Sequence, residues 1–389
     1  MKGILRRWAA RLLIASTLIA VVAPAGAADY LPPKGTDWAR RTPEQAGFDA
    51  AKLQSAIDFA IANENAEPRD LALAIALTRA REPYDAIIGP TQPRGDPTGL
   101  VVRGGYVVAQ WGEPDRVDMT FSVTKSFLST VTGLALDRGL IKNLDDPVRS
   151  ALPGDWFTSE HNRNITWNQL LRQTSNWQGT LWDKPDWADR PTGDDPLAWP
   201  TLTVPAPGTA YEYNDVRVNL LALAVLHVWR QPLPEVLKRD VMDPIGASDT
   251  WRWTGYENSY VEIDGRRVQS VSGGGHWGGG MFINAWDMAR FGLLTERGGR
   301  WGDRQIYSRR WQQIATTPTE IFPTYGVMNW YLNTDRKALP AAPASAFSHL
   351  GAGTNMIYVD PEHDLVVVAR WIKEGQRVEF IARLLAALK

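Results

Sequence analysis

The sequence contains no cysteine and few histidines, five among 389 residues. A chain without cysteine forms no disulfide bond and has neither a thiolate metal site nor a cysteine nucleophile. No His-Glu-x-x-His occurs, and three further histidines show no metal-ligand spacing (His161, His227 and His363), so we expect no metal ion. A glycine-rich run at 273–280 lacks the Lys-Ser/Thr end of a phosphate loop, so no nucleotide and no other cofactor is expected.

An excess of charge of either sign is also lacking. Lysine and arginine number 42 and aspartate and glutamate 43, giving a net charge of −1, which provides no electrostatic case for a nucleic-acid partner or an acidic membrane. Hydrophobic residues make up 44% and charged residues 22%, the composition of a soluble globular protein. Because no internal repeat or separating linker is present, we expect one domain over residues 28–389.

The N-terminus has the features of a signal peptide. Lys2, Arg6, Arg7 and Arg11 precede an apolar run at 12–23, which is too short for a comfortable membrane span of about 20 residues. Ala25-Gly26-Ala27 then forms an A-x-A cleavage site. We therefore expect a signal peptide at 1–27, export to the periplasm or the medium, and no integral membrane segment after cleavage.

The spacing of apolar residues predicts the elements that follow. Helical spacing occurs at 42–62, 216–229, 286–294 and 379–388, and two hairpins are predicted at 100–109 and 356–369, while 71–77 is ambiguous between helix and strand. The strand signal nearly vanishes from 144 to about 259 and resumes after Tyr260. These patterns predict an α+β fold: one antiparallel sheet built from both chain ends, flanked by helices, with an inserted, mostly helical lobe at about 144–259.

Tryptophans are concentrated in the predicted lobe. Six of them lie among prolines, glycines and short apolar runs: Trp156, Trp167, Trp177, Trp182, Trp187 and Trp199. Large aromatic side chains of this kind either fill a core or line a cleft, and core packing is the interpretation we favour for most of them.

A Ser-x-x-Lys motif stands at the front of a helical pattern. Residues three apart share one helix face, so Lys125 is expected beside Ser122. A serine hydroxyl becomes a nucleophile when a neighbouring base takes its proton, and free backbone N–H groups at a helix start suit a developing oxyanion. The alternative is a capping serine followed by a solvated lysine.

Further motifs follow in order: Tyr213-Asn214-Asp215, then His349-Leu350-Gly351 before the last hairpin, with Leu144-Asp145-Asp146 and Leu170-Leu171-Arg172 between the first two. As a set, over residues 40–388, they resemble the serine hydrolases of the class C β-lactamase and penicillin-binding-protein group. That group includes β-lactamases, D-amino-acid-specific peptidases, esterases and hydrolases of nylon-type amide oligomers. The resemblance implies a sheet-plus-helical-lobe fold and an acyl-enzyme mechanism.

Carried over by position, the resemblance makes Ser122 the nucleophile and Lys125 the group that accepts its proton. Tyr213 matches a tyrosine that passes protons to the leaving group, and a nearby lysine ammonium would favour its phenolate. Tyr211 is a fallback for this role. The backbone N–H groups of Ser122 and Ala352 would form the oxyanion hole.

Four residues are expected to bind substrate: Asp215, His349, Gly351 and Trp182. Asp215 replaces the asparagine with which β-lactamases contact the amide of their substrate, and His349 replaces a lysine that helps to bind a β-lactam carboxylate. Both departures place β-lactamase activity below esterase or amidase activity. His276 is an alternative triad base, although structural packing within the glycine-rich run is the interpretation we prefer, and no Gly-x-Ser-x-Gly elbow occurs.

Three functions follow from this pattern. The first is an exported carboxylesterase or linear-amide hydrolase, of the 6-aminohexanoate-oligomer type, whose tryptophans would form an apolar cleft. The second is a cell-wall-directed D-stereospecific peptidase or β-lactamase. The third is a non-catalytic binding protein that keeps the fold. In the first two, the partner is a small ester or amide substrate.

Overall fold

The structure is a computed structural model that describes residues 30–389. The predicted signal peptide at 1–27 lies outside the described residues. Across 30–389, each helix is too short or too polar to cross a membrane.

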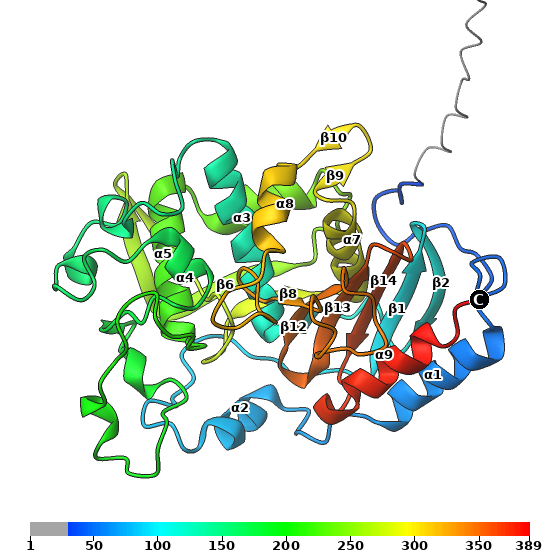
Figure 1. Ribbon diagram of the computed structural model, residues 1–389, viewed down its shortest axis with the longest axis horizontal. Helices are drawn as coiled ribbons and strands as arrows, with labels where there is room; N and C mark the ends of the chain where they lie inside the picture. The colour runs from blue at the N-terminus through cyan, green and yellow to red at the C-terminus, as the bar shows by residue number, and fades with distance from the viewer. Residues whose placement is uncertain (1–29) are drawn as a thin grey trace, which may run out of the picture.

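The main sheet unites the two ends of the chain, as the sequence predicts (Figure 1). Its six strands are all antiparallel to their neighbours and run in the order β11-β12-β13-β14-β1-β2. Their bounds are β1 (Thr98–Arg103), β2 (Tyr106–Trp111), β11 (Trp330–Leu332), β12 (Phe347–Gly351), β13 (Asn355–Asp360) and β14 (Leu365–Arg370).

The helices surround this sheet and fill the lobe. They are α1 (Ala50–Ala62), α2 (Leu71–Arg79), α3 (Thr124–Asp137), α4 (Trp167–Leu171), α5 (Asp215–Trp229), α6 (Leu233–Leu237), α7 (Ala285–Glu296), α8 (Arg309–Ala315) and α9 (Arg377–Leu385). Short helical turns include η1 (Phe121–Val123), η6 (Lys238–Met242), η7 (Ala352–Thr354) and η8 (Glu374–Gln376). Asp70 resolves the ambiguity at 71–77, because its carboxylate caps α2 by accepting from the backbone N–H groups of Ala72 and Leu73.

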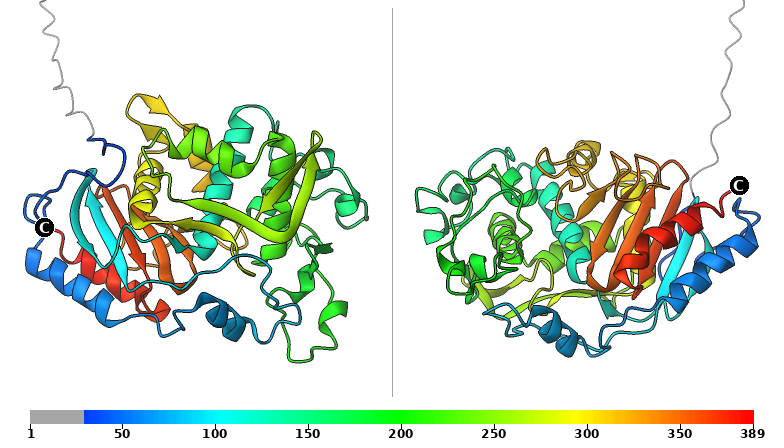
Figure 2. Two further views of the ribbon diagram at one scale, coloured as in Figure 1. Left: turned by 180° about the vertical axis from the view of Figure 1, so that it is seen from behind. Right: turned by 60° about the horizontal axis from the view of Figure 1, so that its bottom comes forward.

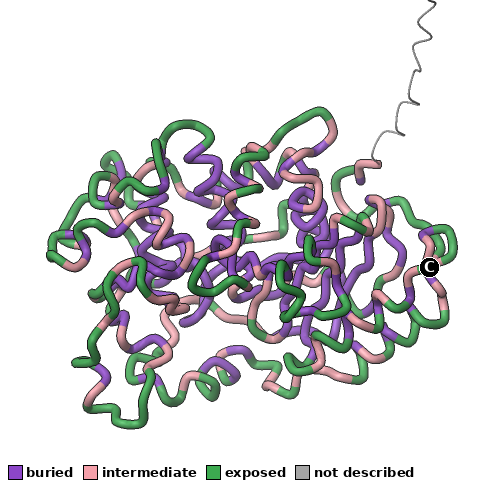
Figure 3. The backbone as a smooth tube through the Cα atoms, in the orientation of Figure 1, coloured by how far each residue is buried: buried purple, intermediate pink, exposed green. Residues whose placement is uncertain are grey.

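Both faces of the sheet are buried, and the side chains of β14 alternate between two cores. Val366 and Val368 join the core that includes α3 and α7, whereas Leu365, Val367 and Ala369 face α1 and α9. Figure 2 shows α1 and α9 side by side across that second face. The result is a helix–sheet–helix sandwich, whose buried strands and exposed outer loops are seen in Figure 3.

The first predicted hairpin is present, and its turn explains the paired glycines. β1 and β2 are joined by Gly104 and Gly105, whose φ angles are 57° and 83°. Two consecutive positive φ values define the turn that matches the twist of a two-residue hairpin.

A second sheet departs from the single sheet that was expected. Four strands run in the order β3-β8-β6-β7, with bounds β3 (Asp118–Met119), β6 (Arg252–Ile263), β7 (Arg266–Val271) and β8 (Gly280–Ile283). Strand structure therefore resumes at Arg252 and not after Tyr260. The polar side chains of Glu257 and Asn258 and a register shift after Gly255 break the apolar alternation that would have revealed this strand. Two-residue strands complete the set: β4 (Thr180–Leu181), β5 (Lys184–Pro185), β9 (Arg300–Trp301) and β10 (Arg304–Gln305).

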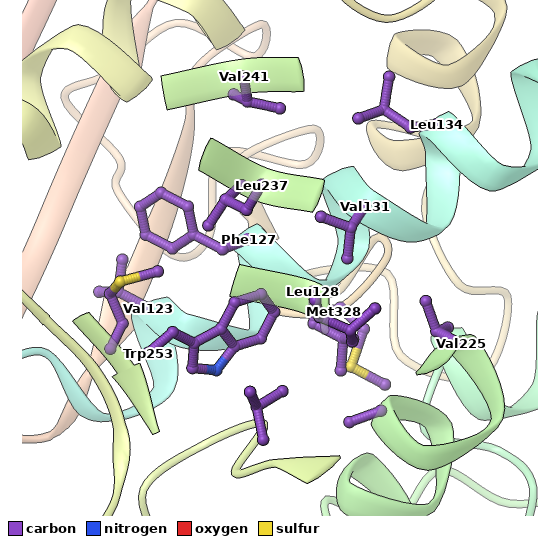
Figure 4. Packing of buried hydrophobic residues seen from close by; sticks show 14 of the residues in the cluster. Val123, Phe127, Leu128, Val131, Leu134, Val225, Leu237, Val241, Trp253 and Met328 are labelled. Carbon is purple, nitrogen blue, oxygen red and sulfur yellow. The ribbon is translucent and has the colours of Figure 1, made fainter. Parts of the chain in front are cut away.

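Helix α3 runs through the main core and is buried from Thr124 to Leu136. Figure 4 shows its apolar side chains packed among those of α5, α6, η6 and β6: Phe127, Leu128, Val131, Leu134, Val225, Leu237, Val241 and Trp253. Close packing of this kind holds the first turn of α3 in one position, and that turn carries the Ser-x-x-Lys motif.

Candidate active site

Ser122 lies in η1, immediately before α3, and is half-buried between fully buried neighbours. Phe121 has a φ of 50°, a left-handed conformation that is uncommon for an aromatic residue and is found at strained functional turns. The turn is tied to β8, since the backbone N–H of Thr120 donates to the carbonyl of Met281 (2.9 Å) and the Met281 N–H donates to Thr124 Oγ1 (3.0 Å). These contacts present the Ser122 hydroxyl at the edge of the core.

Lys125 is completely buried and lies beside Ser122. Its Nζ donates to Ser122 Oγ (2.8 Å) and to Asp215 Oδ1 (2.6 Å). Burial lowers the pKa of Lys125, and the charge of Asp215 opposes that shift without cancelling it. A lowered pKa moves the amine toward its neutral form, which is the form that accepts the proton of a serine hydroxyl.

Asp215 is the counter-ion of this lysine. It is the first residue of α5, where the helix dipole favours a carboxylate, and it forms a second ion pair with Arg190 (2.9 Å). Burial alone would raise the pKa of Asp215, but the charges of Lys125 and Arg190 outweigh it and hold the pKa well below its usual range. The expected substrate contact of Asp215 is therefore corrected: its side chain is 1% exposed and both oxygens face protein cations.

Tyr213 covers the lysine. Lys125 Nζ lies 4.7 Å from the centre of the Tyr213 ring, and the guanidinium carbon of Arg190 lies 5.1 Å from it. The expectation of a phenolate is wrong, because burial and the neighbouring Tyr331 and Asp215 raise the pKa of Tyr213 well above its usual value. Tyr213 is therefore a neutral hydroxyl, which can donate a hydrogen bond. Tyr211, its fallback, stacks on Phe322 instead, with ring centres 4.4 Å apart.

The end of β12 lies against the nucleophile turn. A Cβ at Gly351 would come within 2.1 Å of the Thr120 carbonyl oxygen and 3.0 Å of Ser122 N, so only glycine allows this approach. Asn329 fixes the same junction by donating to the carbonyls of Ser122 and Leu350. Ala352 follows this junction and lines the same pocket as Ser122. The backbones of η1 and of the end of β12 therefore lie side by side where an oxyanion hole would form.

Two of the expected substrate-binding side chains lie elsewhere. His349 alternates with Leu350 along β12 and faces the core, where Nδ1 contacts Ser126 Oγ (2.8 Å) and Nε2 contacts Thr295 Oγ1 (3.2 Å). Burial lowers its pKa to about 3, so His349 is neutral and structural. Trp182 occupies the turn between β4 and β5 with a φ of 54° and packs on the main core outside the pocket.

Four of the six lobe tryptophans lie in the main core or pack against it: Trp156, Trp167, Trp177 and Trp182. Trp167, Trp177 and Trp199 are buried, and Trp156, Trp182 and Trp187 are half-buried. None of these six side chains lines the pocket that contains Ser122. The core interpretation therefore fits four of the six. The expected apolar cleft of tryptophans is not found at Ser122, and Trp187 and Trp199 line a separate pocket in the lobe.

The pocket at Ser122 has a volume of about 330 Å³, which is within the range of small-molecule sites. Ser122, Tyr213, Gly351 and Ala352 meet there. Its charged lining groups come from distant segments: Arg79 from α2, Arg190 from the lobe, and Glu374 and Arg377 from η8 and α9. These residues could not be predicted from the sequence, because nothing in their local patterns distinguishes them from surface charges.

A buried group of ionisable side chains lies behind the pocket. Glu82 Oε2 contacts His276 Nε2 (2.6 Å), and His276 Nδ1 lies 3.6 Å from Asp215 Oδ2. Burial and the charge of Asp189 raise the pKa of Glu82 to about 7, whereas burial and Arg190 lower the pKa of His276 well below its usual value. The preferred interpretation of His276 as a packing residue is thus incomplete, since its ring joins the charge network of Lys125.

The same group is where a metal ion would find ligands. Across residues 30–389, Glu82, Asp189 and His276 are the three that bring ligand atoms within 4.8 Å of one another. Arg190 already pairs with Asp189, so a protein cation balances part of this negative charge. His161, His227 and His363 do not belong to the group.

Comparison with known proteins identifies the family of this chain. The sequence profile described as Beta-lactamase matches residues 94–387. A curated protein of Escherichia coli O157:H7, "Putative D-alanyl-D-alanine carboxypeptidase", is 23% identical over 195 residues, and the match spans 42% of this chain and 45% of that protein. The chain thus aligns with less than half the length of this curated relative.

Solved structures share the fold at low identity. EstCE1, described as a hydrolase with promiscuous acyltransferase activity, superposes with a TM-score of 0.57 at 15% identity, covering 87% of this chain and 98% of its own. A "Putative 6-aminohexanoate-dimer hydrolase" from Bacillus anthracis has the same TM-score and identity, covering 92% and 89%. The protein belongs to the Beta-lactamase family and has the fold of that family.

Proposed function

We propose that the protein cleaves an ester or a linear amide through an acyl-enzyme on Ser122. The observation that carries this proposal is the hydrogen bond of 2.8 Å from a buried lysine to the serine hydroxyl, with Asp215 on the far side of the lysine. A capping serine beside a solvated lysine would not bury the amine completely. The binding-protein alternative does not require a buried amine beside a serine hydroxyl, and burial of an amine is unfavourable unless it is hydrogen-bonded, as Lys125 is to Asp215.

The arrangement of these groups supports the following proposed steps. The neutral amine of Lys125 takes the Ser122 proton while Oγ attacks the carbonyl carbon, and the resulting oxyanion is stabilised by the N–H groups of Ser122 and Ala352. The hydroxyl of Tyr213 gives its proton to the leaving group and recovers one from Lys125. Water then attacks the acyl carbon by the reverse path and releases the acid.

The second candidate is a peptidase or β-lactamase acting on cell-wall-type substrates, which is favoured by the similarity to the curated carboxypeptidase. The environment of Asp215 weighs against it, since both carboxylate oxygens are occupied by Lys125 and Arg190 and offer no contact to a substrate amide. We also propose that the enzyme acts after export, on the basis of the predicted signal peptide.

The test is labelling with a fluorophosphonate, followed by turnover of an aryl butyrate and of a chromogenic cephalosporin. Wild type, Ser122→Ala and the control Ser129→Ala, a buried serine in α3 whose hydroxyl has no hydrogen-bond partner, are compared. We expect labelling and ester hydrolysis in wild type and in Ser129→Ala but not in Ser122→Ala. Faster turnover of the cephalosporin than of the ester would favour the second candidate, and absence of labelling would support the binding protein.

A further inference from the structure

Arg79 is a cation in the pocket without a protein partner. It is the last residue of α2 and lines the pocket with Ser122, and its Nε is buried without a hydrogen bond. Across residues 30–389 it forms no ion pair. The other two pocket arginines differ, since Arg190 pairs with Asp215 (2.9 Å) and Arg377 lies 3.8 Å from Glu374.

This arrangement is unfavourable for the protein alone. Burial and the nearby charge of Arg190 lower the pKa of Arg79, because both disfavour its charged form, and the charges of Glu82, Asp215 and Asp189 oppose that shift without cancelling it. A guanidinium stays charged in proteins, so the unfavourable energy remains in the folded structure unless an anion relieves it. The same two factors would strengthen the interaction with an anion that enters the pocket.

On the side of the pocket formed by β12, no other side chain offers a positive charge to an anion. His349, which would be the nearest candidate on β12, is buried on the opposite face of the strand and neutral. Lys125 is committed to Ser122 and Asp215. Arg79 is therefore the pocket arginine for which no carboxylate of residues 30–389 forms an ion pair, and its planar fork matches a carboxylate.

We propose that Arg79 binds a carboxylate on the non-reacting part of the substrate, so that the enzyme prefers esters or amides carrying a free carboxylate to their neutral analogues. This inference rests on the proposed function and adds the chemical class of the substrate. It agrees with a lining that contains three arginines and one glutamate and with the absence of the lobe tryptophans from that lining.

The test compares two matched pairs of aryl esters. In the first pair the acyl group ends in a carboxylate (p-nitrophenyl hemiglutarate) or is neutral (p-nitrophenyl pentanoate), and in the second the leaving group carries the carboxylate (4-carboxyphenyl butyrate) or does not (phenyl butyrate). Because a charged hydrogen bond is involved, kcat/KM in one pair should favour the anionic ester by about tenfold or more. That pair identifies the side of the scissile bond that faces Arg79.

Variants make the test specific. Arg79→Gln should reduce the anionic-to-neutral ratio about tenfold, and Arg79→Lys should restore part of it, whereas Arg81→Gln should leave the ratio unchanged. Arg81 is a matched control because it lies two residues away, is exposed and pairs with Asp194. A ratio is insensitive to partial loss of folded protein, and equal ratios in wild type and Arg79→Gln would overturn the proposal.

Binding of glutarate separates this proposal from the proposed function. Titration calorimetry with wild type should detect glutarate binding that Arg79→Gln weakens about tenfold and Arg81→Gln does not change. Absence of ester turnover together with Arg79-dependent binding would refute the hydrolase function and keep the anion site. Turnover with glutarate binding that is absent, or unaffected by Arg79→Gln, would keep the hydrolase and refute the anion site.

Discussion

Among single residues, Asp215 provides the negative charge that pairs with two basic side chains at the pocket. Its carboxylate is shared between Lys125 and Arg190 in a region from which water is largely excluded. Removal of one member of a buried ion pair leaves a charge without compensation, which is more damaging than the loss of a surface pair. The stability of the fold and the proton affinity of Lys125 therefore depend on the same carboxylate.

The variant Asp215→Asn tests this dependence. We expect the free energy of unfolding at pH 7 to fall by about 3 kcal/mol, measured by urea denaturation. Since the folded-state pKa of Asp215 is depressed, its contribution is fully present above about pH 4, the unfolded pKa, and is lost as the pH falls further. Asp243→Asn, which removes an exposed partner of Lys238, should change stability by less than about 0.5 kcal/mol. Equal effects of the two variants would show that the buried pair is not stabilising.

For Glu82, the dependence of stability on pH has the opposite sign to that expected for Asp215. Its pKa is raised to about 7, so the folded state binds a proton more tightly than the unfolded chain, and stability falls as the pH rises from about 4.5 to about 7. The full shift corresponds to about 3 kcal/mol, and partial screening by solvent reduces the expected loss to about 2 kcal/mol. Unfolding of Glu82→Gln should depend less on pH between 5 and 8 than unfolding of wild type, by about that amount. The same slope in both proteins would contradict the assigned titration.

Substitution of Gly274 tests whether Lys125 must stay close to Asp215 and Ser122. A Cβ at this position would lie 1.9 Å from Asp215 Oδ1 and 2.1 Å from Lys125 Nζ, so Gly274→Ala has to displace the pair. Displacement by about 1 Å should slow acylation by a fluorophosphonate about 100-fold. Gly375→Ala is the control, because an added methyl meets nothing within 4 Å there. Unchanged acylation in Gly274→Ala would show that the pair is not needed in this geometry.

Among the secondary-structure elements, η1 and β12 meet at a junction that positions Ser122. Asn329 donates to backbone carbonyls of both elements, so it holds the turn that carries Ser122 against the strand that leads to Ala352, where the oxyanion hole is proposed. No sequence motif marks this asparagine, since its partners are main-chain atoms from segments more than twenty residues away on either side.

Replacement of Asn329 by alanine should therefore affect catalysis and stability together. We expect acylation to slow about tenfold and the free energy of unfolding to fall by about 2 kcal/mol. Asn333→Ala is matched to it, because the Asn333 amide is buried and also donates to main-chain carbonyls, those of Leu339, Ala342 and Pro343. That variant should lose similar stability and keep the acylation rate, and equal slowing in both would refute a positioning role for Asn329.

The elements also show where prediction from sequence succeeds. Apolar spacing correctly predicted α5 and both hairpins, because burial on regular faces leaves a periodic pattern in the chain. The pattern did not show on which face of β12 the His349 side chain lies. Both faces of this strand are covered, and apolar and polar side chains occur on each. The start of β6 was missed for a related reason, as its polar residues and bulge hide the alternation.

At the scale of the whole molecule, the pocket collects side chains that are far apart in the chain. Ser122 and Lys125 come from a local motif, and Tyr213 and Asp215 from a second motif, so both pairs were recognisable in sequence. Arg79, Glu82 and His276 meet them only through tertiary packing: α2 packs on a cluster that includes Phe121 and Phe282, and Glu82 contacts His276 of the glycine-rich segment. Their roles depend on tertiary contacts, which a single sequence does not encode in any local pattern.

The charge of the molecule is distributed in the same non-local way. A net charge of −1 excluded a strongly basic or acidic surface, yet the pocket lining contains three arginines and one glutamate. Overall charge therefore predicts little about an enclosed site, because a few buried groups determine the local potential. The preference for anionic substrates is a property of this pocket and not of the chain as a whole.

Acylation of Ser122 can be detected by mass spectrometry of the intact protein. Wild type and Ser122→Ala are mixed with an aryl butyrate, quenched in acid within the first turnovers and weighed side by side. We expect one butyryl adduct on wild type, located at Ser122 by digestion, and none on the variant. Ester turnover by wild type without any adduct, or an adduct that survives in Ser122→Ala, would contradict this expectation.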